Sequence, residues 1–186
     1  MDRRNCLKIF ALTPVAGLAA SLPAQPARAK ENISVDDLQK NWRSLLAPGA
    51  DIASNAQPLV LSDAEWKKRL SPDAYDVLRH EGTEPPGSSP LDYEKRPGVF
   101  VCAGCRLPLF SSAMKFNSGT GWPSFFTTIP GAFATSRDFQ LILPRTEYHC
   151  ARCGGHHGHV FDDGPPPTGL RYCNNGVALA FIPKSG

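Results

Sequence analysis

Two Cys-x-x-Cys pairs constrain the fold of this 186-residue chain more than any other feature. The pairs are Cys102-Ala-Gly-Cys105 and Cys150-Ala-Arg-Cys153, and 44 residues separate them. Each pair follows a candidate strand, so each would lie on the turn at a strand end. Two such turns that face each other bring four thiolates to one point, the tetrahedral arrangement that zinc prefers. The pairs therefore predict one structural zinc ion on Cys102, Cys105, Cys150 and Cys153.

The first 29 residues have the pattern of a cleaved export signal. Twin arginines precede an apolar run over residues 9–22, and Ala-Arg-Ala at 27–29 is a cleavage site of the A-x-A type. The twin arginines indicate a twin-arginine signal, and an ordinary signal peptide or an uncleaved anchor are the alternatives. Residues 30–186 have no net charge, because the chain's charge of +3 lies entirely before them. We expect an exported, periplasmic protein with no nucleic-acid partner and, once the signal is cleaved, no stable membrane association.

Disulfide bonds are the alternative to a metal at the two cysteine pairs. Export brings a protein into compartments where disulfides persist, which keeps this alternative open. A disulfide within a Cys-x-x-Cys pair is usually redox-active, however, and two matched pairs favour a metal. Such an ion would clamp two halves of the domain and stabilise the fold directly.

Helical signals lie before residue 83, and strand signals follow residue 97. Serine caps predict helices over residues 31–46, 62–70 and 72–81, with a polar linker reaching residue 58. Short strands parted by Gly, Pro and Asn turns are expected at 99–101, 107–110, 124–129, 139–143, 147–150, 158–161, 170–173 and 177–182. Closely spaced strands without intervening helices favour antiparallel pairing, so we predict a mainly β protein with short N-terminal helices.

Cys173 stands apart from the two pairs and is a candidate nucleophile. Arg171, two residues earlier, would favour its thiolate, and Asn174-Asn175-Gly176 indicates a turn that brings the sulfur to a strand end. The alternative is that Cys173 is a small, inert core residue.

A histidine cluster and an aromatic turn are the remaining candidates for a site. His156, His157 and His159 could be metal ligands, catalytic acids or surface residues, and strand alternation would separate His156 from the other two. In the segment GTGWPSFF, Trp122 and Phe125 could form an apolar patch for a substrate group. A buried turn with Trp122 in the core is the alternative.

Three motifs, VCAGCRLPLFSS, KFNSGTGWPSF and CARCGGHHGHVFDDGPPPTGLRYCNN, closely resemble those of the B-type methionine sulfoxide reductases. The resemblance runs from about Leu61 to Phe181. It implies two antiparallel sheets with peripheral helices, the same zinc site, and thiol-dependent reduction of methionine (R)-sulfoxide, for which we expect oxidised proteins as the substrate. The chain then divides into the signal (1–29), a helical and linker extension (30–60) and a catalytic domain (61–186).

The resemblance also implies roles for single residues. Cys173 is the nucleophile, Trp122 contacts the methyl end of the substrate, His156 and His159 lie near the sulfoxide oxygen, and Asn175 is a further site residue. His157 takes a position that is usually apolar in the family, so no role is assigned to it.

One departure from the family pattern concerns recycling of the enzyme. Thr120 stands where many members carry a resolving cysteine. With four cysteines on zinc and Cys6 removed with the signal, no second thiol remains to form a disulfide with Cys173. The expected enzyme is therefore a one-cysteine type, and an external small thiol or thioredoxin-like partner would reduce its sulfenic acid.

Two other functions compete with this one. A zinc-ribbon interaction module explains the cysteine pairs but leaves Cys173, Trp122 and the histidines without a role. A zinc hydrolase would use His156 and His159 at an open metal site, so that chelation would abolish activity without unfolding the domain.

Overall fold

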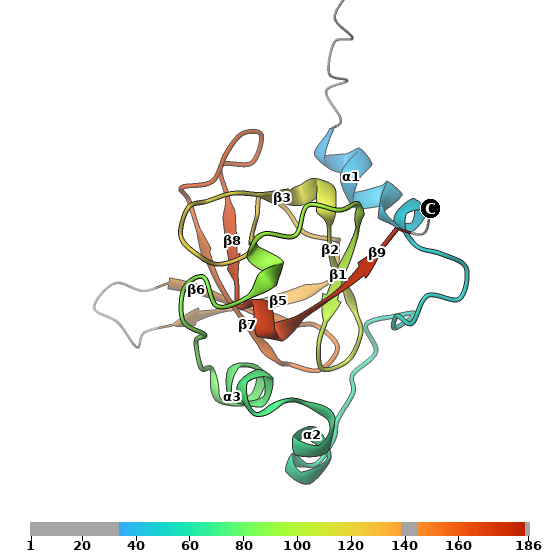
Figure 1. Cartoon of the computed structure of the whole chain (residues 1–186), viewed down its shortest axis with the longest axis vertical. Coiled ribbons are helices and arrows are strands. Elements are labelled where there is room, and N and C mark those ends of the chain that lie inside the picture. The colour runs from blue at the N-terminus through green and yellow to red at the C-terminus, as the bar shows by residue number, and fades with distance from the viewer. Residues whose placement is uncertain (1–33, 139–144, 185–186) are drawn as a thin grey trace, which may run out of the picture. The chain divides into compact units, whose positions relative to one another are not determined.

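Two antiparallel sheets form the body of the protein, as shown by a computed structural model that describes residues 34–138 and 145–184 (Figure 1). The smaller sheet has the order β2-β1-β9 and the larger has the order β3-β4-β8-β7-β6-β5. The strands are β1 Gly98–Cys102, β2 Pro108–Ser111, β3 Lys115–Phe116, β4 Ser124–Phe125, β5 Phe133–Asp138, β6 Arg145–Cys150, β7 His156–Phe161, β8 Arg171–Asn174 and β9 Leu179–Pro183. These two sheets confirm the predicted fold class.

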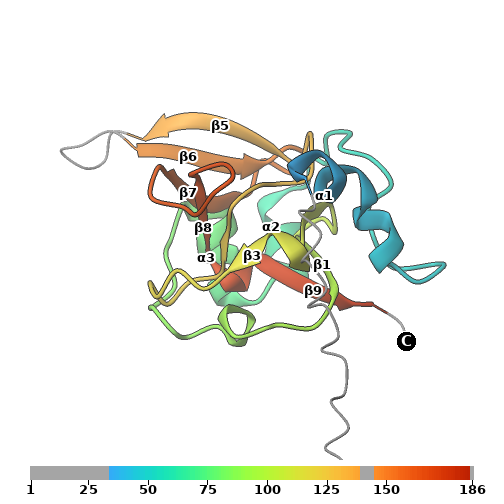
Figure 2. The same cartoon turned by 90° about the horizontal axis from the view of Figure 1, so that it is seen from above.

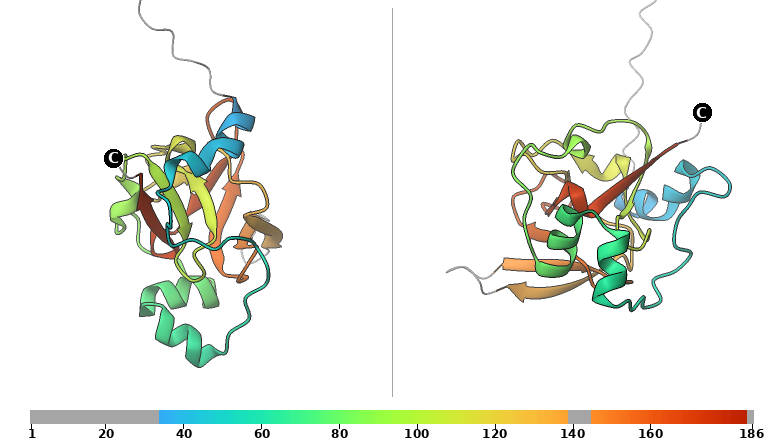
Figure 3. Two further views of the ribbon diagram at one scale, coloured as in Figure 1. Left: turned by 90° about the vertical axis from the view of Figure 1, so that its right-hand side faces the viewer. Right: turned by 60° about the horizontal axis from the view of Figure 1, so that its bottom comes forward.

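Short helices begin where the serine caps predict them. The helices are α1 Val35–Asn41, α2 Asp63–Arg69 and α3 Pro72–His80, with short 3-10 turns at η1 Trp42–Leu45, η2 Pro90–Asp92, η3 Ser112–Met114 and η4 Gly176–Ala178. Ser34, Ser62 and Ser71 each accept a hydrogen bond from the backbone N–H three residues on, and Ser62 forms a full capping box with Glu65. Helices α2 and α3 lie at one end of the β body and α1 at the other (Figure 3).

The main differences from the predicted strands lie in the larger sheet. β5 was not expected, because its residues Phe-Ala-Thr-Ser-Arg-Asp are mostly polar, yet every one of them pairs with β6 (Figure 2). The strand predicted over 139–143 lies outside the described residues, as does the predicted export signal. β4 has only two residues instead of the six expected over 124–129. β7 begins at His156, two residues before the predicted start.

Aromatic side chains fill the space between the two sheets. Phe100 of β1 and Phe110 of β2 have no exposed surface, and neither has Phe125 of β4. The Phe110 and Phe125 rings stack at 3.9 Å between centroids, and Phe100 meets Phe125 edge-on at 5.1 Å. Aromatic pairs of this kind stabilise a core beyond the effect of area alone. This contact fixes the smaller sheet against the larger one.

The predicted linker is docked on the body rather than free of it. The Ala53 N–H donates to the Arg106 carbonyl at 2.9 Å, and the Leu59 N–H donates to the Arg152 carbonyl at 2.7 Å. Both acceptors lie in the two cysteine turns, so this segment ties the turns together from outside. Residues 34–60 accordingly belong to the same compact unit as the β body. Within the described parts of the chain, no helix is long and apolar enough to cross a membrane.

Candidate active site and metal centre

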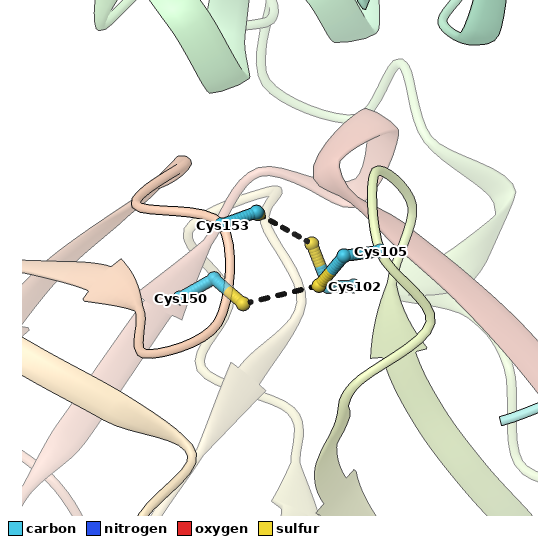
Figure 4. Close-up of side chains that lie close together, drawn as sticks. All are labelled: Cys102, Cys105, Cys150 and Cys153. Atoms are coloured by element: carbon cyan, nitrogen blue, oxygen red, sulfur yellow. Dashed lines mark hydrogen bonds between the residues drawn. The ribbon is translucent and has the colours of Figure 1, made fainter. Parts of the chain in front are cut away.

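The two cysteine turns face each other, as the spacing of the pairs predicts (Figure 4). Cys102 and Cys105 come from the turn after β1, and Cys150 and Cys153 come from the turn between β6 and β7. The Cys102 and Cys153 sulfurs are 3.7 Å apart, the Cys105 and Cys150 sulfurs are 3.4 Å apart, and all four lie within 4.8 Å of one another. All four are buried and none forms a disulfide. The disulfide alternative is therefore not the arrangement of this structure.

Both turns have the same backbone hydrogen bonds. In the first, the Arg106 N–H donates to the Cys102 carbonyl at 2.9 Å, and in the second the Gly154 N–H donates to the Cys150 carbonyl at 2.8 Å. Arg106 and Gly154, each directly after the second cysteine of its pair, both adopt a positive φ. Glycine adopts this conformation without strain, whereas an arginine requires support from its surroundings. The chain therefore builds the same thiol-presenting turn twice.

The sulfur geometry fits a metal ion. A tetrahedral site with metal–sulfur bonds of about 2.3 Å places its sulfurs about 3.8 Å apart, close to the separations found here. Hydrogen bonds among the thiols, then burial, raise the pKa of Cys102 well above its ordinary value of 9.0. Four buried thiolates in contact would repel one another, so a bound cation is needed to hold them ionised. The four side chains fill all four tetrahedral positions, which leaves none open for a substrate.

A row of register partners across the larger sheet carries the reactive side chains. Cys173 of β8 lies opposite His159 of β7 on one side and Ser124 of β4 on the other, and His159 lies opposite Glu147 of β6. Directly paired residues of antiparallel strands point to the same face of the sheet. The fold therefore places the candidate nucleophile beside the candidate proton donor.

A β-bulge changes which face of β7 each histidine occupies. Tyr148 pairs with Gly158 but His149 pairs with His156, so His157 is an extra residue in β7. His156 therefore shares the face of His159, and their rings meet edge-on with centroids 5.5 Å apart. The expectation from strand alternation, that His157 and His159 share a face, is wrong. His157 has no exposed surface and packs in the core beside Tyr148.

A small pocket opens at this row. Its volume is about 160 Å³, and its lining residues are Thr83, Trp122, Arg145, Gly158, His159, Phe161, Cys173, Asn174 and Asn175. The Trp122 indole and the Phe161 ring give it an apolar wall, while His159 and Cys173 bring polar chemistry to its floor. A pocket of this size accommodates a single side chain rather than an extended ligand.

Opposing effects act on the Cys173 thiol. Burial raises its pKa above the ordinary value of 9.0, while the Arg171 guanidinium and hydrogen bonds from Thr120 and Arg171 lower it. Arg171 is itself fixed by two hydrogen bonds of 2.8 Å to the Asp163 carboxylate. The sequence predicts the influence of Arg171 but not the stronger effect of burial.

His156 lies behind the pocket rather than in its lining. It is 2% exposed, and its Nδ1 atom contacts the Glu147 carboxylate. Burial lowers the pKa of His156 to about 4, although the Glu147 carboxylate acts in the opposite direction. His156 is therefore neutral at physiological pH. Of the two histidines, His159 is the one in position to meet a substrate.

Glu84 is an important residue that the sequence analysis missed. Its carboxylate accepts hydrogen bonds from the Gly176 and Val177 N–H groups, and its carbonyl accepts the Trp122 Nε1–H at 3.1 Å. Its own N–H donates to Asn175 Oδ1 at 3.0 Å. One buried residue thus positions both Trp122 and Asn175. A glutamate in the proline-rich segment after α3 has no pattern that distinguishes it from a surface residue.

Asn175 and Phe125 differ in their relation to the pocket. Asn175 lines it, but its amide is engaged with backbone, since its Nδ2 donates to the His157 carbonyl at 3.1 Å. It positions the strands around the pocket. The prediction that Phe125 contacts the substrate is wrong, because Phe125 does not line the pocket and is fully buried between Phe110 and Phe100. Residues of β4 alternate between faces, so Phe125 points away from the face that carries Ser124 and Cys173.

Comparisons with known proteins agree with this geometry. A family model described as the SelR domain matches residues 70–183. The peptide methionine sulfoxide reductase MsrB of Agrobacterium fabrum is 51% identical over 123 residues, which are 66% of this chain and 91% of that protein. Peptide methionine sulfoxide reductase B1, chloroplastic, of Arabidopsis thaliana is 51% identical over 180 residues, which are 96% of this chain and 88% of that protein.

The MsrB of Methanosarcina barkeri is similar to the same degree, with 53% identity over 121 residues. The region matched by the family model includes all four clustered cysteines, Cys173 and the pocket residue His159. This chain belongs to the SelR domain family, the family of the MsrB peptide methionine sulfoxide reductases.

Proposed function

We propose that this chain is a peptide methionine sulfoxide reductase that reduces the R isomer of methionine sulfoxide through Cys173. The observation that carries the proposal is the pairing of Cys173 with His159 across β7 and β8, in a pocket walled by Trp122. A thiol, an imidazole and an indole in one small pocket match the three needs of this reaction. These are a nucleophile, a hydrogen-bond donor for an oxygen that gains charge, and a site for a methyl thioether.

In the proposed reaction, the Cys173 thiolate attacks the sulfur of the sulfoxide. A proton reaches the sulfoxide oxygen as the S–O bond breaks, and His159 is placed to deliver it. The hydroxyl group formed in this way passes to the Cys173 sulfur, which becomes a sulfenic acid. The bond between Cys173 and the substrate sulfur breaks, and methionine leaves with the electron pair of that bond. The thiol is oxidised by two electrons while the sulfoxide is reduced by two. Trp122 holds the methyl group and keeps water away from the sulfur.

Recycling of the sulfenic acid needs an external reductant. Among the residues that the structure describes, Cys173 is the one thiol outside the four-cysteine cluster, and Thr120 approaches it where many members of the family carry a resolving cysteine. The reductant is a small thiol or a thioredoxin-like protein, and it attacks Cys173 directly. The enzyme is a one-cysteine type.

The cysteine cluster holds one structural zinc ion in this proposal. Zinc suits four thiolates in a closed tetrahedral site and brings no redox chemistry of its own. It orders the two cysteine turns and takes no part in the reaction. A zinc hydrolase on His156 and His159 is disfavoured because His156 is grouped with Glu147 and His149 rather than with His159, which lines the pocket with Cys173. An interaction module leaves the pocket unexplained.

Substrate and compartment follow from the pocket and from the N-terminal sequence. The pocket accepts one side chain and is open to solvent, which suits a methionine sulfoxide within an oxidised protein or peptide. The signal pattern over residues 1–29 supports export, by the twin-arginine route to the periplasm, where such substrates would be met.

A single-turnover assay without reductant tests the proposal. Reduced, zinc-loaded protein is mixed with racemic N-acetyl methionine sulfoxide, and both the methionine product and the isomer consumed are measured. We expect about one methionine per protein from the R isomer, a sulfenic acid trapped on Cys173, and no product from Cys173→Ser. A disulfide that joins Cys173 to another cysteine of the chain would contradict the one-cysteine scheme. No product from folded, zinc-loaded protein, with either this substrate or an oxidised peptide, would contradict the activity itself.

A further inference from the structure

A second group of potential metal ligands lies on the same sheet face as the reactive row. Glu147 and His149 are two residues apart on β6, so their side chains share a face. His156 is the register partner of His149, and the bulge in β7 turns it to that face. One carboxylate oxygen and one nitrogen from each imidazole lie within 4.8 Å of one another. None of the three residues belongs to the cysteine cluster.

The potential ligand atoms of these three residues lie close together, but they do not provide one another with all the hydrogen bonds that they need. His149 Nε2 is 3.1 Å from Glu147 Oε2, and His156 Nδ1 contacts the other carboxylate oxygen, Oε1. His156 is 2% exposed, yet its Nδ1 finds no aligned hydrogen-bond partner among the described residues. Buried polar atoms in native proteins are nearly always partnered. A buried nitrogen that touches an oxygen without hydrogen-bond alignment is the arrangement that a shared ion would complete.

Access to the group is from one side. Glu147 and His156 are buried, whereas the His149 side chain is 22% exposed. The hydroxyl of Ser136 on the edge strand β5 lies 3.4 Å from both Glu147 Oε2 and His149 Nε2. An ion can therefore reach the group past His149 and Ser136 and retain water on its exposed side.

We propose that Glu147, His149 and His156 form a second metal site, which binds a divalent transition-metal ion of the zinc class. Two imidazoles and one carboxylate suit zinc, cobalt or iron rather than magnesium or calcium, which prefer oxygen ligands. Three protein ligands leave at least one coordination position for water, unlike the closed cysteine cluster. An ion bound there can exchange with solution, because the site is open on one side.

Occupation of this site acts on the pocket through His156. The His156 ring packs against His159, which lines the pocket opposite Cys173. An ion bound to His156 puts a positive charge beside His159 and holds both rings in place. We infer that the ion inhibits the reductase, because it fixes the His156 ring against His159 and so restricts the movement of His159 toward a substrate in the pocket. This consequence rests on the proposed function, whereas the binding itself does not.

Cobalt is the probe for the binding test. Protein with zinc already in the cysteine cluster is titrated with Co²⁺ and followed by absorption and by equilibrium dialysis. We expect one further ion per chain, with weak d–d bands and without the intense thiolate-to-cobalt bands of a cysteine site. His149→Gln should weaken this binding by at least about tenfold. His80→Gln is the matched control, because His80 also pairs with a carboxylate, Asp76, but on the surface of α3. It should bind cobalt like the wild type.

Equal cobalt binding by His149→Gln and the wild type would overturn the proposal, as would thiolate-to-cobalt bands from the added ion. If His149→Gln fails to fold, NMR of the wild type gives the same decision. Bound Co²⁺ should broaden the ring signals of His149 and His156 and spare those of His80, and the reverse pattern would overturn the site.

The inhibition is tested by single-turnover methionine release at saturating Co²⁺. We expect release to fall at least about tenfold in the wild type and to stay unchanged in His149→Gln, whose activity without cobalt should equal that of the wild type. Cobalt binding without loss of turnover would overturn the inhibition and leave the metal site established. If the cobalt-free wild type released no methionine, that result would instead contradict the proposed function.

Discussion

At the scale of single residues, the reactivity of Cys173 depends on a balance between burial and charge. Burial keeps the thiol protonated in the resting enzyme, and Arg171 offsets part of that effect. Arg171 can do so because Asp163 holds its guanidinium by two hydrogen bonds. A bidentate pair fixes the position of the cation as well as its charge. Burial therefore limits the thiolate fraction of Cys173, and with it the oxidation of this sulfur.

This balance predicts the pH dependence of Cys173. Only the thiolate reacts with iodoacetamide, and burial raises the pKa, so the alkylation rate should rise with pH and reach its midpoint above 9.0. Arg171→Gln removes the favourable charge, raises the pKa further and should slow alkylation at pH 8 by roughly tenfold. Arg96→Gln is the control, because Arg96 pairs with Glu94 on the surface. A midpoint below 9.0, or an unchanged rate in Arg171→Gln, would count against this account.

At the scale of secondary-structure elements, the bulge in β7 decides the composition of the site. Without it, His157 would take the place that His156 occupies. The bulge depends on Gly158, whose φ is +152° and whose position leaves no room for a Cβ, since such an atom would lie 2.0 Å from the Cys173 carbonyl oxygen. The close approach of β7 to β8 at Cys173 therefore requires glycine.

Gly158→Ala should accordingly disrupt the pairing of β7 with β8. We expect a loss of about 3 kcal/mol in the free energy of unfolding, from strain and displaced backbone together. Urea denaturation measures it. Gly131→Ala is the matched control, because Gly131 also has a positive φ but open space around its Cβ position, so it should lose only about 1 kcal/mol. Equal losses in the two variants would show that steric contact with Cys173 is unimportant.

Elements also show where sequence reasoning succeeds. Serine caps marked the starts of α1, α2 and α3, because capping is a local interaction that leaves a local pattern. β5 left no such pattern, since its six residues pair with β6 while four of them, Ala134 to Arg137, are exposed. The bulge was equally absent from the pattern, because the stretch Gly-Gly-His-His-Gly-His over residues 154–159 does not reveal which residue is extra. Both elements depend on partners distant in sequence.

At the scale of the whole molecule, the spacing of two cysteine pairs predicted the cluster that joins the sheets. Four cysteines in two matched pairs strongly constrain where the turns that carry them can lie. A single buried polar residue such as Glu84 acts through tertiary hydrogen bonds, which no sequence pattern predicts. Phe125 shows the same limit, since only its packing on Phe110 distinguishes a core ring from a pocket ring.

Metal removal should unfold the protein as a whole. Structural zinc in small domains contributes about 10 kcal/mol or more, which matches or exceeds the total stability of an ordinary domain. Protein unfolded with denaturant and chelator should therefore fail to refold without zinc, and should regain near-UV circular dichroism and activity together when zinc is added. Cys105→Ser should behave like the zinc-free protein. Native spectra without metal would contradict a structural role for the ion.

The turn that bears Cys150 and Cys153 is also the connection from β6 to β7, the two strands that carry Glu147 and His159. Anchoring that turn sets the register of the hairpin, and with it the aim of the side chains at the pocket. A molecule that lacks its ion would therefore have no activity, rather than a reduced activity. In a cell that makes this protein, the zinc supply should therefore set the number of active molecules rather than the activity of each one. The capacity to repair oxidised methionine should follow that number.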